Sequence, residues 1–194
     1  MKNQQDPELY EHKRQQLQAL VELYKQDYIE LFFADEVTFS LIPSVPYGWL
    51  PIGKQTELPT QKAKVMKLFG MVNLDNRFYG FPTNEKIDAD YIIEIFDSMI
   101  PKLKKPTVIV LDNASFHHKA VKTKKEEWEK QNLFIFFLPP YSPHLNRIEI
   151  LWRFIKHKWL QPKDYLNSKS LWDAIINILK GFGTEFNIQF SQQF

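Results

Sequence analysis

The chain has 194 residues, 44% of them hydrophobic, with 16 Phe, 8 Tyr and 5 Trp. This is the composition of a globular domain with a large core and excludes a disordered chain. It contains no Cys, which excludes disulfides and thiolate metal sites and predicts a reducing, cytoplasmic compartment. No apolar run approaches the ~18 residues of a membrane span, and the polar stretch MKNQQDPELYEHKRQ lacks a signal-peptide core.

The net charge of +2 conceals a basic band. Residues 101–163 carry 13 Lys and Arg against 5 Asp and Glu, whereas residues 1–100 carry 10 against 15. Such a band indicates an anionic partner, most simply nucleic acid. A solvated lysine-rich helix is the alternative that charge alone leaves open.

Hydrophobic spacing and turn residues divide the chain into alternating helices and strands. The expected elements are a helix at 7–26, a strand at 28–42, a loop or irregular hairpin at 43–59, two strands around Asp75–Asn76 within 64–82, a helix from an N-cap at Asp88 to about Pro101, a strand at 107–115, a helix at 117–131, a strand at 132–140, and helices at 144–160 and 168–182. This order predicts a single domain with a mixed α/β sheet covered by helices.

Two acids occupy unusual places in the expected strands. Asp35 lies within the apolar segment LFFADEVTF, where a carboxylate is costly to bury unless it is paired or bound to a metal. The alternative is an edge strand whose Asp35 or Glu36 points to water. Asp112 follows the apolar run VIVL, at the end of a strand where ligands bind in open α/β sheets. The alternative there is an ordinary Asp-Asn turn.

A third acid, Glu149, lies in the first turn of the helix at 144–160. Asn146 and Glu149 have capping-box spacing, and Glu149 and Arg153 are spaced for a surface ion pair. On a helical wheel, however, Glu149, Arg153 and Lys156 form a polar stripe beside a buried stripe that consists of Ile148, Trp152, Ile155 and Trp159. An acid beside two cations fits a metal site next to phosphates.

Together, Asp35, Asp112 and Glu149 suggest a metal site. Carboxylate oxygens suit Mg²⁺ or Mn²⁺, whereas no Cys and five scattered His give little support for zinc. Two such ions about 3.5–4 Å apart activate the attacking oxygen and stabilise the leaving oxygen in phosphoryl transfer.

Three segments, ADE at 34–36, LDNASFH at 111–117 and LPPYSPHLNRIEILW at 138–152, resemble the catalytic blocks of DDE-type transposases. The similarity is to the mariner-like superfamily and its bacterial insertion-sequence branch, and it covers about residues 28–160. It implies an RNase H-like fold, with a five-stranded mixed sheet and catalytic core at 28–160 between helical segments at 1–27 and 161–194. It also implies metal-dependent cleavage at transposon ends and attack of the freed 3′-hydroxyl on target DNA, without a covalent protein–DNA intermediate.

The resemblance assigns roles to individual residues. Asp35, Asp112 and Glu149 are implied to be the catalytic ligands of two Mg²⁺ or Mn²⁺ ions. Further side chains are implied to support the site or contact DNA, namely Asn113, His117 and Asn146. The basic band is expected to contact phosphates through Lys119, Arg147, Arg153 and Lys156. For His117, a helix-start residue without a special role is the alternative.

The chain departs from the family pattern in two places. Arg147 stands where the family usually has Pro. The family normally carries helix-turn-helix domains before the first strand, so we expect a catalytic half of a split gene, a fragment or a decayed copy, with end recognition on a separate chain.

A homodimer is implied, and the helices at 7–26 and 168–182 either form its contact surfaces or pack on the core of their own chain. The alternatives are another RNase H-like nuclease, which would not join ends, and a non-catalytic, domesticated DNA-binding or assembly protein.

Overall fold

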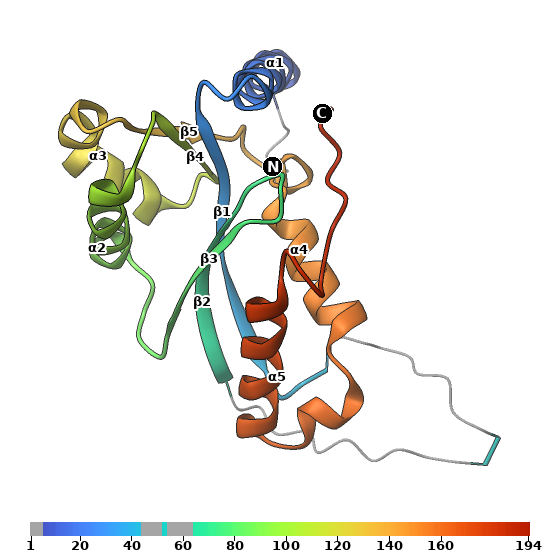
Figure 1. The fold of residues 1–194 in the computed structure, drawn as a ribbon. Helices are drawn as coiled ribbons and strands as arrows, with labels where there is room; N and C mark the ends of the chain where they lie inside the picture. The colour runs from blue at the N-terminus through green and yellow to red at the C-terminus, as the bar shows by residue number, and fades with distance from the viewer. Residues whose placement is uncertain (1–5, 44–51, 54–63) are drawn as a thin grey trace.

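The computed structural model describes residues 6–43, 52–53 and 64–194. Most of the loop or hairpin expected at 43–59 lies outside the described residues. A five-stranded sheet with the order β3-β2-β1-β4-β5 forms the centre of the fold (Figure 1). Its strands are β1 (Glu30–Ser40), β2 (Lys64–Val72), β3 (Phe78–Thr83), β4 (Thr107–Leu111) and β5 (Leu133–Phe137).

The sheet is mixed. The β1, β2 and β3 strands form an antiparallel meander, whereas β4 and β5 continue from β1 in parallel. β4 is buried along its whole length, as expected of a central parallel strand covered on both faces. The pairing of β1 with β4 runs from Glu30↔Thr107 to Phe33↔Val110, so the second half of β1 extends past the end of β4.

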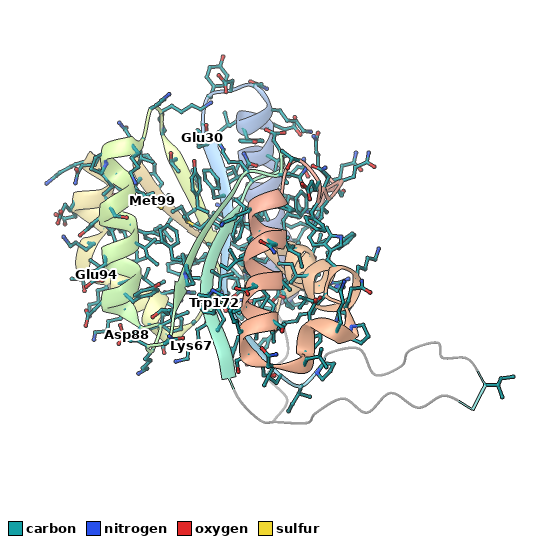
Figure 2. All side chains as sticks on the ribbon, turned by 60° about the horizontal axis from the view of Figure 1, so that its bottom comes forward. Glu30, Lys67, Asp88, Glu94, Met99 and Trp172 are labelled. Atoms are coloured by element: carbon teal, nitrogen blue, oxygen red, sulfur yellow. The ribbon has the colours of Figure 1, made fainter. Side chains whose placement is uncertain are left out.

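Helices cover both faces of the sheet (Figure 1). On one face lie α2 (Ala89–Met99) and α3 (Ser115–Lys130), whose core includes Phe96 and Trp128. On the other lie α1 (Pro7–Lys25), α4 (Ile148–Phe154) and α5 (Ser168–Gly181). Figure 2 shows α2 with Glu94 and α5 with Trp172 on opposite sides of the strands. The remaining short helices are the 3₁₀ helices η1 (Ile100–Lys102), η2 (Pro143–Leu145) and η4 (Pro162–Leu166) and the π-helix η3 (Ile155–Trp159), which follows α4 directly.

The two outer helices contribute to the main core. Leu17 and Val21 of α1 and Leu171 and Ile175 of α5 are fully buried in the same cluster as β1 and α4. The burial of these residues agrees with the alternative that the two helices pack on the core of their own chain. Within the described residues, no helix is long and apolar enough to cross a membrane.

The predicted order of helices and strands is confirmed, with two local differences. β4 ends at Leu111 and not at 115, because Asp112 Oδ1 accepts the N–H of Ala114 in a tight turn that leads into α3. The helix expected at 144–160 is interrupted. Asn146 adopts an extended conformation between η2 and α4, and its side chain reaches out of the helix to β1.

Candidate active site

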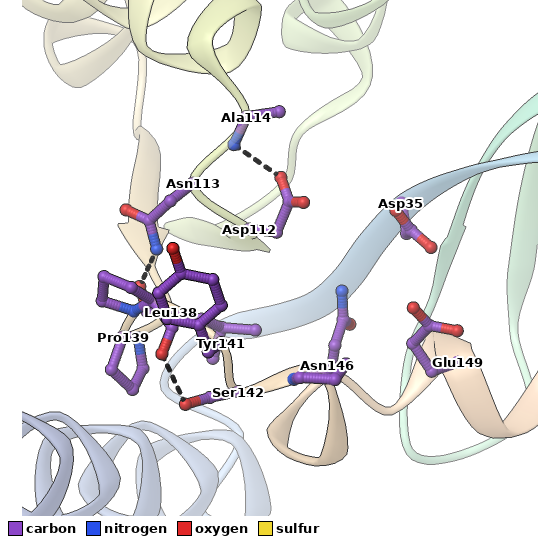
Figure 3. A pocket seen from close by; sticks show the side chains of 12 residues that line it. Asp35, Asp112, Asn113, Ala114, Leu138, Pro139, Tyr141, Ser142, Asn146 and Glu149 are labelled. Atoms are coloured by element: carbon purple, nitrogen blue, oxygen red, sulfur yellow. Dashed lines mark hydrogen bonds between the residues drawn. The ribbon is translucent and has the colours of Figure 1, made fainter. Parts of the chain in front are cut away.

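A cavity of about 410 Å³ lies at the carboxyl ends of β4 and β5 (Figure 3). Asp35 reaches it from β1, Asp112 from the end of β4, and Glu149 from the first turn of α4. The rest of its wall consists of Asn113, Ala114, Leu138, Pro139, Pro140, Tyr141, Ser142, Pro143 and Asn146. Three acids that are far apart in the sequence therefore line one cavity, at the edge of the sheet where α/β folds bind ligands.

Asp35 lies on the face of the sheet that α4 covers, where a residue of α4 contacts it. The indole Nε1 of Trp152 donates a hydrogen bond of 3.1 Å to Asp35 Oδ2. On β2, Asp35 pairs with Gly70, where an added Cβ would lie 2.6 Å from Trp152 Cη2. The absence of a side chain at Gly70 therefore lets the indole approach the strand.

The pKa of Asp35 is raised to about 8, first because burial disfavours its charged form and then because of the negative charges of Glu36, Glu149 and Asp112. Figure 3 shows Asp35 between Asp112 and Glu149. A divalent cation would relieve this repulsion. Within the described ranges, however, no three Asp, Glu or His side chains are close enough to hold one common ion.

Asp112 is oriented by two hydrogen bonds to the same oxygen. Its Oδ1 accepts from the backbone N–H of Ala114 at 3.0 Å and lies 2.8 Å from His117 Nδ1. The hydrogen bond with His117 is the main reason why the pKa of Asp112 is lowered. Both bonds end on Oδ1, so Oδ2 is left on the cavity side, toward Asp35 (Figure 3).

The capping interpretation of Glu149 is wrong. No side chain caps α4, and the amide Nδ2 of Asn146 donates to the carbonyl of Ala34 at 3.0 Å. Asn146 thus joins the start of α4 to β1 beside Asp35, and it is buried. The surface pair between Glu149 and Arg153 is also not formed among the ion pairs of the described residues. The Glu149 carboxylate instead lines the cavity on the side of Asp35.

The other expected support residues lie around the same edge. Asn113 donates from Nδ2 to the carbonyl of Leu138, which joins the ends of β4 and β5. Its Oδ1 lies 3.1 Å from His118 Nε2, and the ring of His118 stacks on Phe137. His117 is fully buried and contacts Asp112, which argues against a helix-start residue without a role.

The four expected phosphate contacts differ in their surroundings. Lys119 on α3 and Arg153 on α4 are exposed, and Lys156 is half-buried, with Nζ 5.7 Å from the centre of the Phe39 ring. Arg147 is buried. Its guanidinium donates to the carbonyl of Gln193 at 2.6 Å and lies 3.9 Å from the ring centre of Phe194. The guanidinium of Arg147, which was expected to contact DNA, thus contacts the C-terminal residues instead.

Sequence reasoning missed two contacts beside the acids, that of Trp152 with Asp35 and that of Glu36 with His117, the partner of Asp112. Trp152 was assigned only to the buried stripe, yet it is also the donor to Asp35. Glu36 was considered as a side chain that points to water, whereas its Oε2 is buried and lies 3.7 Å from His117 Nε2. The signal for Glu36 was present in the sequence, because successive residues of a strand point to opposite faces of the sheet.

The fold is RNase H-like, and the chain is similar in structure to Mos1 mariner transposase complexes. The chain aligns with the Mos1 transposase paired-end complex with left transposon end at a TM-score of 0.54, with 14% identity over 93% of this chain and 62% of that one. It aligns with the Mos1 mariner paired-end complex with Mn at a TM-score of 0.51, with 14% identity over 92% of this chain and 61% of that one. The chain therefore spans less than two thirds of the length of these structures.

Sequence comparison gives a relative and a family. An uncharacterized protein of Sinorhizobium fredii, y4pE/y4sA, is 39% identical over 61 residues, which are 30% of this chain and 42% of that protein. Residues 30–171 match the family model of the DDE superfamily endonucleases. This match covers β1, the end of β4 and α4, and thus all three cavity acids. The chain belongs to the DDE superfamily endonucleases.

Proposed function

We propose that the chain is the catalytic domain of a transposase, which cleaves DNA strands at transposon ends and joins the freed 3′-hydroxyl to target DNA. The observation that carries the proposal is that Asp35, Asp112 and Glu149 line one cavity at the carboxyl edge of the sheet. In cleavage, a water oxygen bonds to phosphorus and the 3′ oxygen leaves as a hydroxyl. In transfer, that hydroxyl attacks a phosphodiester of the target and displaces its 3′ oxygen.

The residues present fit a divalent metal. Their donors are carboxylate oxygens, which Mg²⁺ and Mn²⁺ prefer, and burial together with neighbouring negative charge raises the pKa of Asp35. Asp35, Asp112 and Glu149 would share two ions between them, because the three carboxylates are not close enough to hold one common ion. When bound, they would activate the attacking oxygen and stabilise the leaving one.

The chain's own residues prepare this site. Trp152 directs Asp35, His117 and the Ala114 amide direct Asp112, and Asn146 fixes the start of α4 and thereby Glu149. The positive side chains of Lys119 on α3, Arg153 on α4 and Lys156 on η3 would bind the phosphates that flank the reacting one. We further propose that two copies act together, since two ends must be joined, and that a helix-turn-helix domain recognises the end sequences.

The test is a strand-cleavage and joining assay with the purified chain, labelled duplex DNA and Mn²⁺ or Mg²⁺. We expect nicking that requires the metal and joined products when one duplex carries a free 3′-hydroxyl. Asp35→Asn, Asp112→Asn and Glu149→Gln should each abolish both products, while the surface variant Asp173→Asn should retain them. Cleavage without joined products would identify a nuclease that lacks transfer. Activity that survives all three substitutions would refute the proposal.

A further inference from the structure

Glu36 lies next to Asp35 in β1 but on the other face of the sheet. Asp35 points to the α4 face, where Trp152 contacts it. Glu36 points to the α3 face, where it meets His117. The alternation of strand side chains therefore places two consecutive acids on opposite faces of the sheet, Asp35 in the cavity and Glu36 toward α3.

His117 is enclosed between two carboxylates. The ring is fully buried, with Phe116 at 4.2 Å and Phe69 at 6.4 Å between ring centres. Nδ1 lies 2.8 Å from Asp112 Oδ1, and Nε2 lies 3.7 Å from Glu36 Oε2. Neither Nε2 nor Oε2 has a hydrogen-bond partner in the described structure, although both are buried.

Buried polar atoms are nearly always paired, and each exception calls for an explanation. Here two such atoms face each other, and both belong to the chain of contacts that leads to Asp112. We propose that Glu36 is a positioning residue of the site, which fixes the ring of His117 and through it the rotamer of Asp112. The inference rests on the proposed function, because it assigns Glu36 a part in that same site.

The geometry explains how a residue outside the cavity acts on Asp112. Rotation of the His117 ring by a half turn would replace Nδ1 by a carbon and remove the donor to Asp112. The same rotation would replace Nε2 by a carbon on the side of Glu36, so a proton held between Nε2 and Glu36 Oε2 would oppose it. With Oδ1 of Asp112 held by His117 and Ala114, Oδ2 remains directed to the cavity. Partners of this kind behind metal ligands change metal affinity by about 10–100-fold when they are removed.

The experiment compares Glu36→Met, which keeps the volume and removes the polar atoms, with Glu36→Gln, which keeps a polar group within reach of Nε2. Glu30→Gln is the matched control, because it removes an acid at the other end of β1. Two readouts require no DNA: the ¹⁵N chemical shifts of the His117 ring in the metal-free chain, and the Mn²⁺ dissociation constant measured by electron paramagnetic resonance. Circular dichroism checks folding.

We expect Glu36→Met to shift or broaden the His117 signals and to weaken Mn²⁺ binding about 10-fold or more. In Glu36→Gln, the His117 signals and the Mn²⁺ affinity should lie closer to those of the unaltered chain than they do in Glu36→Met. Glu30→Gln should change neither quantity. Unchanged His117 signals and Mn²⁺ affinity in Glu36→Met would overturn the inference. If Glu36→Met does not fold, Glu36→Ala carries the same comparison.

The two proposals fail in different ways. If the unaltered chain neither cleaves DNA nor binds Mn²⁺, the proposed function fails, yet the His117 signals still decide whether Glu36 fixes the ring. If the chain cleaves DNA and Glu36→Met leaves the ring signals and the metal affinity unchanged, only the role of Glu36 is refuted.

Discussion

The indole of Trp152 donates a hydrogen bond of 3.1 Å to Oδ2 of Asp35, across 117 residues of sequence. Through this bond the helix that carries Glu149 is attached directly to the strand that carries Asp35. Trp152 is buried, so the same side chain packs the core and orients an acid of the cavity. Core packing and site geometry are therefore linked at one residue.

Replacement of this donor should affect stability and metal binding together. Trp152→Phe keeps an aromatic ring but removes the N–H, and a typical hydrogen bond contributes about 0.5–1.5 kcal/mol, the range that applies because the raised pKa keeps Asp35 largely protonated at neutral pH. We expect the free energy of unfolding to fall by about that amount and Mn²⁺ affinity to fall about 10-fold. Urea unfolding and a Mn²⁺ titration measure the two effects. Trp172→Phe on α5 is the control and should leave Mn²⁺ affinity unchanged.

Gly70 should not tolerate a side chain. A Cβ there would lie 2.6 Å from Trp152 Cη2 and 2.8 Å from Phe78 Cε2, and overpacking of this kind costs about 1–3 kcal/mol. We expect Gly70→Ala to lower Tm by roughly 2–4 °C per kcal/mol lost, for a domain of this size. The cost should be smaller in a Trp152→Phe background, because the smaller ring gives way. Equal costs in both backgrounds would contradict the proposed contact.

The raised pKa of Asp35 predicts a pH dependence of stability in the metal-free chain. The pKa is about 8 in the folded protein, against an ordinary value of 3.8. Between these values the folded state binds a proton that the unfolded state does not, so stability should fall as pH rises from about 4 to 8. Asp35→Asn removes this loss. At pH 8.5 we expect it to be more stable than the unaltered chain by on the order of 2 kcal/mol.

The measurement is Tm against pH for the unaltered chain, Asp35→Asn and the surface control Asp173→Asn. Mn²⁺ should raise Tm of the unaltered chain at pH 8.5, by binding the folded state only, and should not raise that of Asp35→Asn. Parallel curves for the unaltered chain and Asp35→Asn would show that Asp35 is ionised without cost, and the raised pKa would be wrong.

Charge reversal at Arg153 and Lys156 tests the proposed DNA surface. Each phosphate contact contributes about −0.9 to the slope of log K against log salt concentration. The double variant Arg153→Glu, Lys156→Glu should therefore weaken duplex binding and reduce the slope by roughly 2. Lys169→Glu on α5 is the control. A slope that does not change in the double variant would show that these two side chains lie away from the DNA.

Arg147 should behave differently from the exposed cations. Its guanidinium binds the Gln193 carbonyl and stacks on Phe194, so Arg147→Met should lower the free energy of unfolding by about 1–3 kcal/mol. The salt dependence of DNA binding should remain the same, because the group does not face the phosphates in this arrangement. Urea unfolding and the binding isotherms measure both. A flatter salt slope with unchanged stability would restore Arg147 to the DNA surface.

Local patterns in the sequence were sufficient for most of the fold. Strand alternation, helical spacing and turn residues are short-range properties, and they predicted each helix and strand together with the buried stripe of Ile148 and Trp152 on α4. The acids were predicted from three different positions, Asp35 inside an apolar strand, Asp112 at a strand end and Glu149 in the first turn of a helix, and from the resemblance of their flanking segments.

The remaining features depend on contacts between distant segments. Asn146 was interpreted as a cap because Glu149 follows at the right spacing, but a competing partner, the Ala34 carbonyl of β1, holds its side chain. Arg147 contacts the C-terminal residues, and no local pattern predicts that pairing. Sequence spacing thus identifies what a side chain is able to do nearby, and tertiary packing decides which partner it takes.

The opposite orientation of Asp35 and Glu36 restricts how this part of the gene can vary in length. Loss or gain of a single codon between Glu30 and Asp35 would reverse the two faces, so that the acid of the cavity would turn toward His117 and its neighbour toward Trp152. A similar change in the connection at 84–88, which precedes α2, would leave both orientations intact. Among relatives, we therefore expect connecting segments to differ in length while the spacing within this strand stays constant.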